Sequence, residues 1–302
     1  MANLKTWFLE TRPSFLLLVP VCVFTGVAAS LYDGYPFRPL YFALAFIGAL
    51  FAHISVNVLN EYSDYKTGID FKTQRTPFSG GSGLLPAGLL KPAQALMLGL
   101  GSLAITVAIG IYFTVIYTWA ILPLGIVGVL IILLYTPYLT KLPGVTELVG
   151  PGLGFGLMVL GTYVTQSGDY RVASVLVSLV AGLLIANLLL INEFPDVEAD
   201  RPAGRKHLPI ILGRAKAAWI YCAIAVLAYA VIVVGVAIDS LPLWALLGLA
   251  TLPLGVKAMA GALKHHSDIP KLVPALGMNV ITVLLTPTLM SVGIVIGTYT
   301  LV

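Results

Sequence analysis

The stretch VASVLVSLVAGLLIANLLLINEFPDVEAD, residues 172–200, contains the two features that decide the fold. It opens with an apolar run of about twenty residues, which as a helix is long enough to cross a bilayer. The run lacks the apolar–polar alternation of a transmembrane barrel strand and is too long for one. Four acids then follow within eight residues, at positions 193, 196, 198 and 200. The stretch predicts a membrane helix that ends in an acidic cluster.

The composition extends this prediction to the whole chain. Of its 302 residues, 59% are hydrophobic and 10% are charged, with a mean hydropathy of +0.97. Soluble domains carry roughly 25% charged residues, so water could not solvate this surface and lipid must. Nine apolar runs are long enough to span, at about 12–31, 39–62, 92–113, 117–136, 145–166, 171–193, 215–237, 241–262 and 274–299. We therefore expect an all-α polytopic membrane protein with nine transmembrane helices.

Positive charges orient these runs. With a cytoplasmic N-terminus, 15 of the 17 lysines and arginines fall inside and only Arg38 and Arg171 fall outside. This is a strong positive-inside bias, which predicts a multi-pass protein of the cell membrane. The net charge of +4 thus reflects topology, and no basic–aromatic pattern points to nucleic acid.

Two cytoplasmic segments hold seven of the thirteen acids. They are NEYSDYKTGID at 60–70, the first acidic motif, and NEFPDVEAD at 192–200, the second. Both begin with Asn-Glu-aromatic-x-Asp, at an offset of 132 residues, and both follow an apolar run. This repetition predicts one membrane domain of two related four-helix halves, about 1–140 and 141–302, each with an acid cluster after its second helix.

The spacing within each motif predicts a shared face. Asn57, Asn60 and Asp64 lie three and four residues apart, as neighbours on a helix do. Asn192, Asp196 and Asp200 are each four apart, and Gly68 allows a turn before Asp70. Carboxylates gathered at one cavity would repel one another unless divalent cations neutralised them. Carboxylate and amide oxygens suit Mg²⁺, which takes phosphate oxygens and waters as its other ligands.

Basic residues near the motifs complete the predicted site. They are Lys72, Arg75, Lys141, Arg201, Arg205, Lys206 and His207. Metal ions together with such cations would bind a diphosphate, and in a membrane cavity this indicates a lipid diphosphate. Ionisation of an allylic diphosphate leaves a carbocation that needs a dry apolar cavity. Tyr135, Tyr138, Phe155 and Tyr163 are candidate aromatic stabilisers of that cation, although each is individually more typical of plain packing, Tyr135 less so because it lies near Lys141.

Both motifs closely resemble those of the UbiA superfamily of intramembrane prenyltransferases, and the resemblance covers nearly the whole chain. It implies nine helices around a central cavity and two Mg²⁺ ions bound with a polyprenyl diphosphate. By position, Asn60, Asp64 and Asp70 would hold one ion, and Asn192, Asp196 and Asp200 the other. Diphosphate ligands would be Lys141, Arg205 and Lys206, with Lys72 and Arg75. Arg12, Tyr135 and Asn57 would lie near the acceptor or the reacting carbon, with Asp64, Asp196, Lys141 and Tyr135 as the catalytic set.

The form Asn-x-x-x-Asp-x-x-x-Gly-x-Asp, together with Gly161–Gly168, resembles the branch that prenylates 1,4-dihydroxy-2-naphthoate for menaquinone. Glu61, Glu193 and the stretch RTPFSGGSG depart from that branch. The acceptors 4-hydroxybenzoate, haem, chlorophyllide and a glycerol ether lipid therefore stay open, as does a secondary transporter with duplicated halves. A lipid phosphotransferase would need the spacing D-x-x-D-G-x-x-A-R, which the sequence lacks. His53 is interpreted as a packed core residue.

Overall fold

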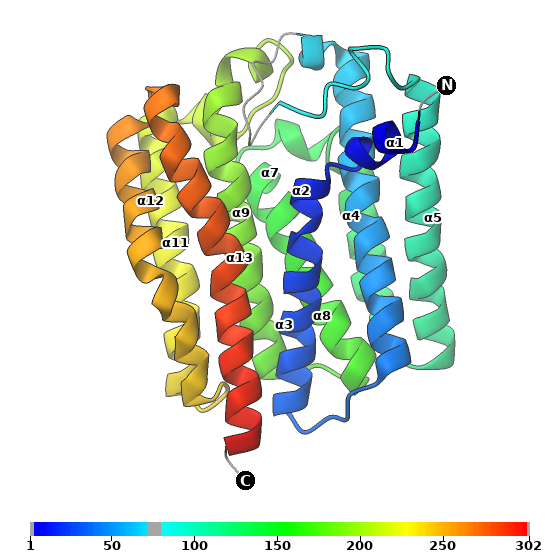
Figure 1. Cartoon of the computed structure of the whole chain (residues 1–302), viewed down its shortest axis with the longest axis vertical. Helices are drawn as coiled ribbons and strands as arrows, with labels where there is room; N and C mark the ends of the chain where they lie inside the picture. Colours follow the sequence, from blue (N-terminus) through cyan, green and yellow to red (C-terminus); the bar gives the residue numbers. More distant parts are fainter. Residues whose placement is uncertain (1–2, 72–79, 301–302) are drawn as a thin grey trace.

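The structure is a computed structural model that describes residues 3–71 and 80–300, and every regular element in that part of the chain is helical (Figure 1). Eight segments are long and apolar enough to cross a membrane. These are α2 with α3 (Pro13–Tyr32), α4 (Pro39–Thr67), α5 (Pro92–Ile116), α7 to α8 (Val145–Ser167), α9 (Val172–Asp200), α11 (Arg214–Ala237), η4 with α12 (Leu243–His265) and α13 (Ile269–Thr300). Helices of this length and apolarity can cross a bilayer because they satisfy their own backbone groups in lipid. The chain is therefore a multi-pass membrane protein.

The remaining predicted span, about 117–136, forms a shorter apolar helix, α6 (Ile121–Leu134). Its 14 residues rise about 21 Å, which is less than the roughly 30 Å of hydrocarbon in a bilayer. Eight of the nine predicted runs thus form helices of spanning length, and the ninth forms a helix in the same place that is shorter than predicted. The remaining elements are short: α1 (Leu4–Glu10), η1 (Ile69–Phe71), η2 (Leu139–Lys141) and α10 (Leu208–Ile211).

Helices α4 and α9 run in the same direction, so their acidic C-terminal ends lie at one end of the bundle (Figure 1). Helix α4 has Pro39 in its first turn and stops at Gly68, whose φ of 78° is the left-handed conformation that glycine adopts most easily. Helix α9 instead continues past Pro195 to Asp200. Arg38 and Arg171 precede these two helices and lie at the opposite end.

Helix α9 forms the centre of the packing. In its most apolar stretch, 72% of the residues are buried, against 33% for α4. Helices α3, α8, α11 and α13 surround it. Small residues permit close approach, since a Cβ on Gly182 would lie 2.5 Å from the backbone oxygen of Gly152. Large apolar side chains remain exposed on α5, α6 and α11, as expected where lipid covers the outer surface.

Candidate active site

A cavity of about 810 Å³ opens between α4, α5, α6, α8 and α9. From α4, the side chains of His53, Asn57, Asn60 and Asp64 line it, at intervals of four, three and four residues. This spacing places them on one helical face. The prediction of a common face for Asn57, Asn60 and Asp64 agrees with this lining, and the face continues deeper to His53.

The second acidic motif lines the same cavity. Asn192, Glu193, Asp196 and Asp200 all belong to its wall. Asp70 joins them from η1, because the turn at Gly68 redirects the chain after α4 ends. Asp64, Asp70 and Asp200 are all at least nine-tenths buried, although they lie at helix ends. Buried carboxylates at this density need cations as partners.

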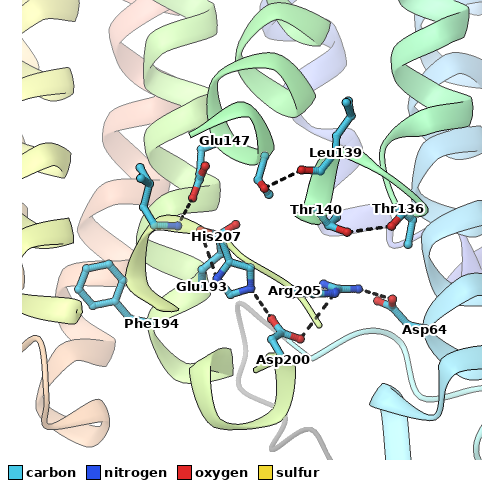
Figure 2. A network of polar contacts seen from close by, with 12 residues as sticks. Asp64, Thr136, Leu139, Thr140, Glu147, Glu193, Phe194, Asp200, Arg205 and His207 are labelled. Atoms are coloured by element: carbon cyan, nitrogen blue, oxygen red, sulfur yellow. Dashed lines mark hydrogen bonds and ion pairs between the residues drawn. The ribbon is translucent and has the colours of Figure 1, made fainter. Parts of the chain in front are cut away.

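Arg205 is one such partner. Its guanidinium pairs with Asp64 of the first motif, and its Nε lies 3.7 Å from Oδ1 of Asp200 in the second (Figure 2). Burial alone would lower the pKa of Arg205, but the carboxylates of Asp64 and Asp200 more than offset this and raise it. Arg205 therefore joins the two acidic motifs as a permanently charged bridge.

A buried polar network supports the second motif. His207 Nε2 lies 2.7 Å from Asp200 Oδ2, and its Nδ1 lies 3.9 Å from Glu193 Oε2 (Figure 2). The backbone N–H of Leu208 donates to Glu147 Oε1 at 2.7 Å. Lys206 donates its backbone N–H to the carbonyl oxygen of Thr140. These contacts fix residues 200–208 against the segment between α6 and α8.

The first motif has a different set of supports. Glu61 accepts hydrogen bonds from the backbone N–H and the hydroxyl of Ser82, and that hydroxyl also lies 3.2 Å from Glu10 Oε2. Arg12, with a left-handed φ of 56°, lies 3.7 Å from Glu61 and 4.5 Å from the Phe15 ring centre. Burial, followed by the charge of Glu61, raises the pKa of Glu10 to about 8. The N-terminal segment and residues 80–83 thus cover the first motif together.

Comparison with known proteins agrees with this geometry. The model of the UbiA prenyltransferase family matches residues 18–293. The chain belongs to the UbiA prenyltransferase family. Curated relatives include the 1,4-dihydroxy-2-naphthoate octaprenyltransferases of Haemophilus influenzae, 30% identical over 98% of this chain and 97% of the relative, and of Bacillus subtilis, 29% identical over 85% and 81%.

Solved UbiA homologues have the same fold. One from Aeropyrum pernix superimposes with a TM-score of 0.71 at 22% identity, covering 92% of this chain and 97% of that one. Another, from Archaeoglobus fulgidus and bound to GPP and Mg²⁺, gives a TM-score of 0.59 at 15% identity, covering 95% and 99%. The family match and the curated relatives make the protein a prenyltransferase, and the transporter alternative is set aside.

The structure brings most of the predicted site residues of this prenyltransferase to the cavity. Its lining includes Arg12, Asn57, Tyr135 and Arg205 together with the six predicted metal ligands. The Tyr135 ring lies against Gly150, where any Cβ would collide with it. Lys141 and Lys206 are exposed and are not among the lining residues. Lys72 and Arg75 lie outside the described residues.

Four residues at or beside the site have contacts that the sequence reasoning did not predict. Glu10, Glu147, His207 and His53 are each at least nine-tenths buried. His207 was predicted only as one of the basic residues after the second motif, and nothing in the sequence signalled that Glu147 would accept from the Leu208 N–H. Glu10 had no signal, because its approach to Ser82 depends on tertiary folding. His53 did have a signal, since it lies four residues before Asn57 on the predicted face.

Proposed function

We propose that this enzyme transfers a polyprenyl group from its diphosphate to an aromatic acceptor, 1,4-dihydroxy-2-naphthoate, in menaquinone biosynthesis. The observation that carries the proposal is the single cavity that both acidic motifs line, with Arg205 joined to each. Deeper in the membrane, residues such as Ile109, Leu124 and Val129 make the wall apolar. A charged mouth above an apolar chamber suits a substrate with a diphosphate head and a hydrocarbon tail.

The residues of the mouth fit Mg²⁺ by their chemistry. All are oxygen donors of the kind that Mg²⁺ prefers, and Asn192 Oδ1 is a buried acceptor without a hydrogen-bond partner among the described residues. Within residues 3–71 and 80–300, no three His, Cys, Asp or Glu side chains form a ready-made metal cluster. This agrees with an ion that takes its other ligands from water and substrate phosphate.

We assign two ions. Asn60, Asp64 and Asp70 would hold one, and Asn192, Asp196 and Asp200 the other. When bound, Mg²⁺ would neutralise the diphosphate and so make it a better leaving group. The homologue from Archaeoglobus fulgidus, whose structure contains GPP and Mg²⁺, supports the presence of Mg²⁺ at such a site.

The protein's own cations would then bind the diphosphate. Arg205 is the strongest candidate, because its planar guanidinium can exchange the Asp64 carboxylate for phosphate oxygens. Lys206, Lys141, Lys72 and Arg75 are assigned weaker roles as diphosphate ligands. The ring of Tyr135 would face the developing cation, and Arg12 and Asn57 would contact the acceptor.

We also propose that this charged mouth faces the cytoplasm. Arg38 and Arg171, the two cations that the sequence places outside, precede α4 and α9 at the end opposite the acidic motifs. A cysteine introduced at the exposed Arg201 should therefore resist an impermeant thiol reagent added to intact cells. Labelling of that cysteine from outside would reverse the orientation.

A prenyl-transfer assay tests the reaction. Purified enzyme in lipid would receive labelled geranylgeranyl diphosphate and Mg²⁺, with 1,4-dihydroxy-2-naphthoate or 4-hydroxybenzoate in parallel. We expect a prenylated naphthoate only, and no product after exhaustive chelation. A product from 4-hydroxybenzoate alone would overturn the naphthoate assignment, and full turnover without divalent metal would overturn the metal assignment.

A further inference from the structure

His53 occupies an unusual position for a charged or ionisable side chain. It is the fifteenth of the 29 residues of α4, so it lies at the middle of a membrane-spanning helix. In the described spans, the other Asp, Glu, Lys, Arg and His residues lie within about two turns of a helix end, apart from Lys257, which is exposed. Histidine at this depth is costly, and such residues usually have a functional partner.

One nitrogen of this imidazole has no partner in the part of the chain that the structure describes. His53 is 4% exposed, and its Nδ1 has no hydrogen-bond partner among the described residues. Its nearest ring neighbour is Phe155, at 4.8 Å and an interplanar angle of 89°. The hydroxyls of Thr106 and Thr162, which line the same cavity, already donate to backbone carbonyls. These two hydroxyls have no further proton to donate, whereas Nδ1 of His53 still lacks a partner among the described residues.

The position of His53 indicates which part of a ligand it meets. It shares a face of α4 with Asp64, and the rise of a helix puts it about 16 Å deeper along the axis. The diphosphate belongs at Asp64, and a prenyl tail has no polar atom to offer. A polar group on the deep wall therefore corresponds to a second substrate, which must approach the reacting carbon from the side away from the diphosphate.

We propose that His53 contacts the acceptor and hydrogen-bonds a hydroxyl on its aromatic ring, with the Phe155 ring beside it. This inference rests on the proposed function for its choice of acceptor class. It makes His53 a determinant of acceptor specificity, because the apolar wall around it could not otherwise compensate for burying a hydroxyl. A site with such a group discriminates strongly against an analogue that lacks the hydroxyl.

The test measures the KM of each substrate separately in His53→Leu, His53→Gln and the unaltered enzyme. The half-buried residue His266, just after α12 and outside the cavity lining, offers a control, His266→Leu. We expect His53→Leu to raise the acceptor KM by about tenfold or more, from the loss of one buried hydrogen bond. The KM for geranylgeranyl diphosphate should stay within twofold. His53→Gln, which keeps a donor and an acceptor, should recover most of the loss.

A comparison of two ligands distinguishes a hydrogen bond from His53 to the acceptor from a purely structural role of His53. The unaltered enzyme should prefer 1,4-dihydroxy-2-naphthoate to 2-naphthoate, which has no ring hydroxyl, and His53→Leu should lose that preference. An unchanged preference, or equal rises in both KM values, would overturn the proposal. If the enzyme prenylates only 4-hydroxybenzoate, the naphthoate assignment fails. The proposal for His53 is then tested by comparing the binding of 4-hydroxybenzoate and benzoate in the unaltered enzyme and in His53→Leu.

Discussion

The two acidic motifs share one sequence pattern but are built differently. In the first, α4 ends at Thr67 and a left-handed glycine turns the chain so that η1 carries the last aspartate. In the second, the chain stays helical to Asp200, and the whole motif belongs to α9, the most buried of the eight described spans. The first motif is covered by the N-terminal segment and residues 80–83, and the second is held by the buried His207 and Glu147 contacts. The same ligand types are thus presented by a helix followed by a turn in one motif and by a continuous buried helix in the other.

The largest effect should come from deleting one acid of either motif. We expect Asp64→Ala and Asp196→Ala each to lower kcat by about 10³-fold or more, since each removes charge that neutralises the leaving group. Glu198→Ala is the matched control, because that acid belongs to the second motif but is 74% exposed and pairs with Arg214. If the kcat of Asp196→Ala were as high as that of Glu198→Ala, the second motif would not contribute to catalysis as the first does, and the account of two equal motifs would be contradicted.

Replacing the bridge between the motifs should have the next largest effect. Arg205→Lys keeps the charge but loses the planar fork that meets both Asp64 and Asp200. We expect kcat/KM for the prenyl diphosphate to fall by about ten- to a hundredfold, whereas Lys206→Arg at the exposed neighbour should change it little. Near-normal kinetics in Arg205→Lys would show that the charge alone suffices.

The turn of the first motif offers a smaller test. In Gly68→Ala the new Cβ meets nothing within 4 Å, so the cost is that of a left-handed backbone, about 1 kcal/mol. We expect a similar loss of stability in Gly88→Ala, whose φ is 68° and whose Cβ is equally free. Only Gly68→Ala should also raise the Mg²⁺ concentration needed for half-maximal activity, by a few-fold. Equal metal requirements in the two variants would argue against Asp70 as a ligand.

The smallest effect concerns Glu10, in the segment that covers the first motif, and the dependence of folding stability on pH. Between its ordinary value of 4.5 and its raised pKa of about 8, Glu10 keeps a proton in the folded protein that it loses on unfolding. Stability should therefore fall as pH rises through this window and level off above it. Glu10→Gln cannot ionise, so its melting temperature in chelator should decline less from pH 5 to pH 8. Parallel pH profiles for the two proteins would contradict a protonated Glu10.

The fold was largely predictable because lipid imposes one rule on every span. Apolar runs of about twenty residues can only be helices, and the runs correspond to the helices found, except that α6 is shorter than predicted. The shared face of Asn57, Asn60 and Asp64 followed from helical periodicity alone. The relation between the two halves remains a prediction from the repeated motif.

Contacts between distant segments were beyond the sequence. Lys141 and Arg205 are both cations near the motifs, but only Arg205 lies in the cavity wall, because residues 200–208 fold back over α9. Glu10 and Ser82 meet across 72 residues, a separation that periodicity does not encode. His53 is packed and buried as predicted, but its place in the cavity wall depends on how α4, α8 and α9 pack, which periodicity does not encode.

The most direct test of a single site made from both motifs is binding of a non-reactive substrate. The thiolodiphosphate analogue of geranylgeranyl diphosphate would be titrated with Mg²⁺ into the unaltered enzyme, Asp64→Ala, Asp196→Ala and the double variant. We predict one analogue per chain, a large loss of affinity in either single variant, and little further loss in the double, since neighbouring groups of one site are not additive. Two analogues per chain, or losses that simply add, would contradict the account.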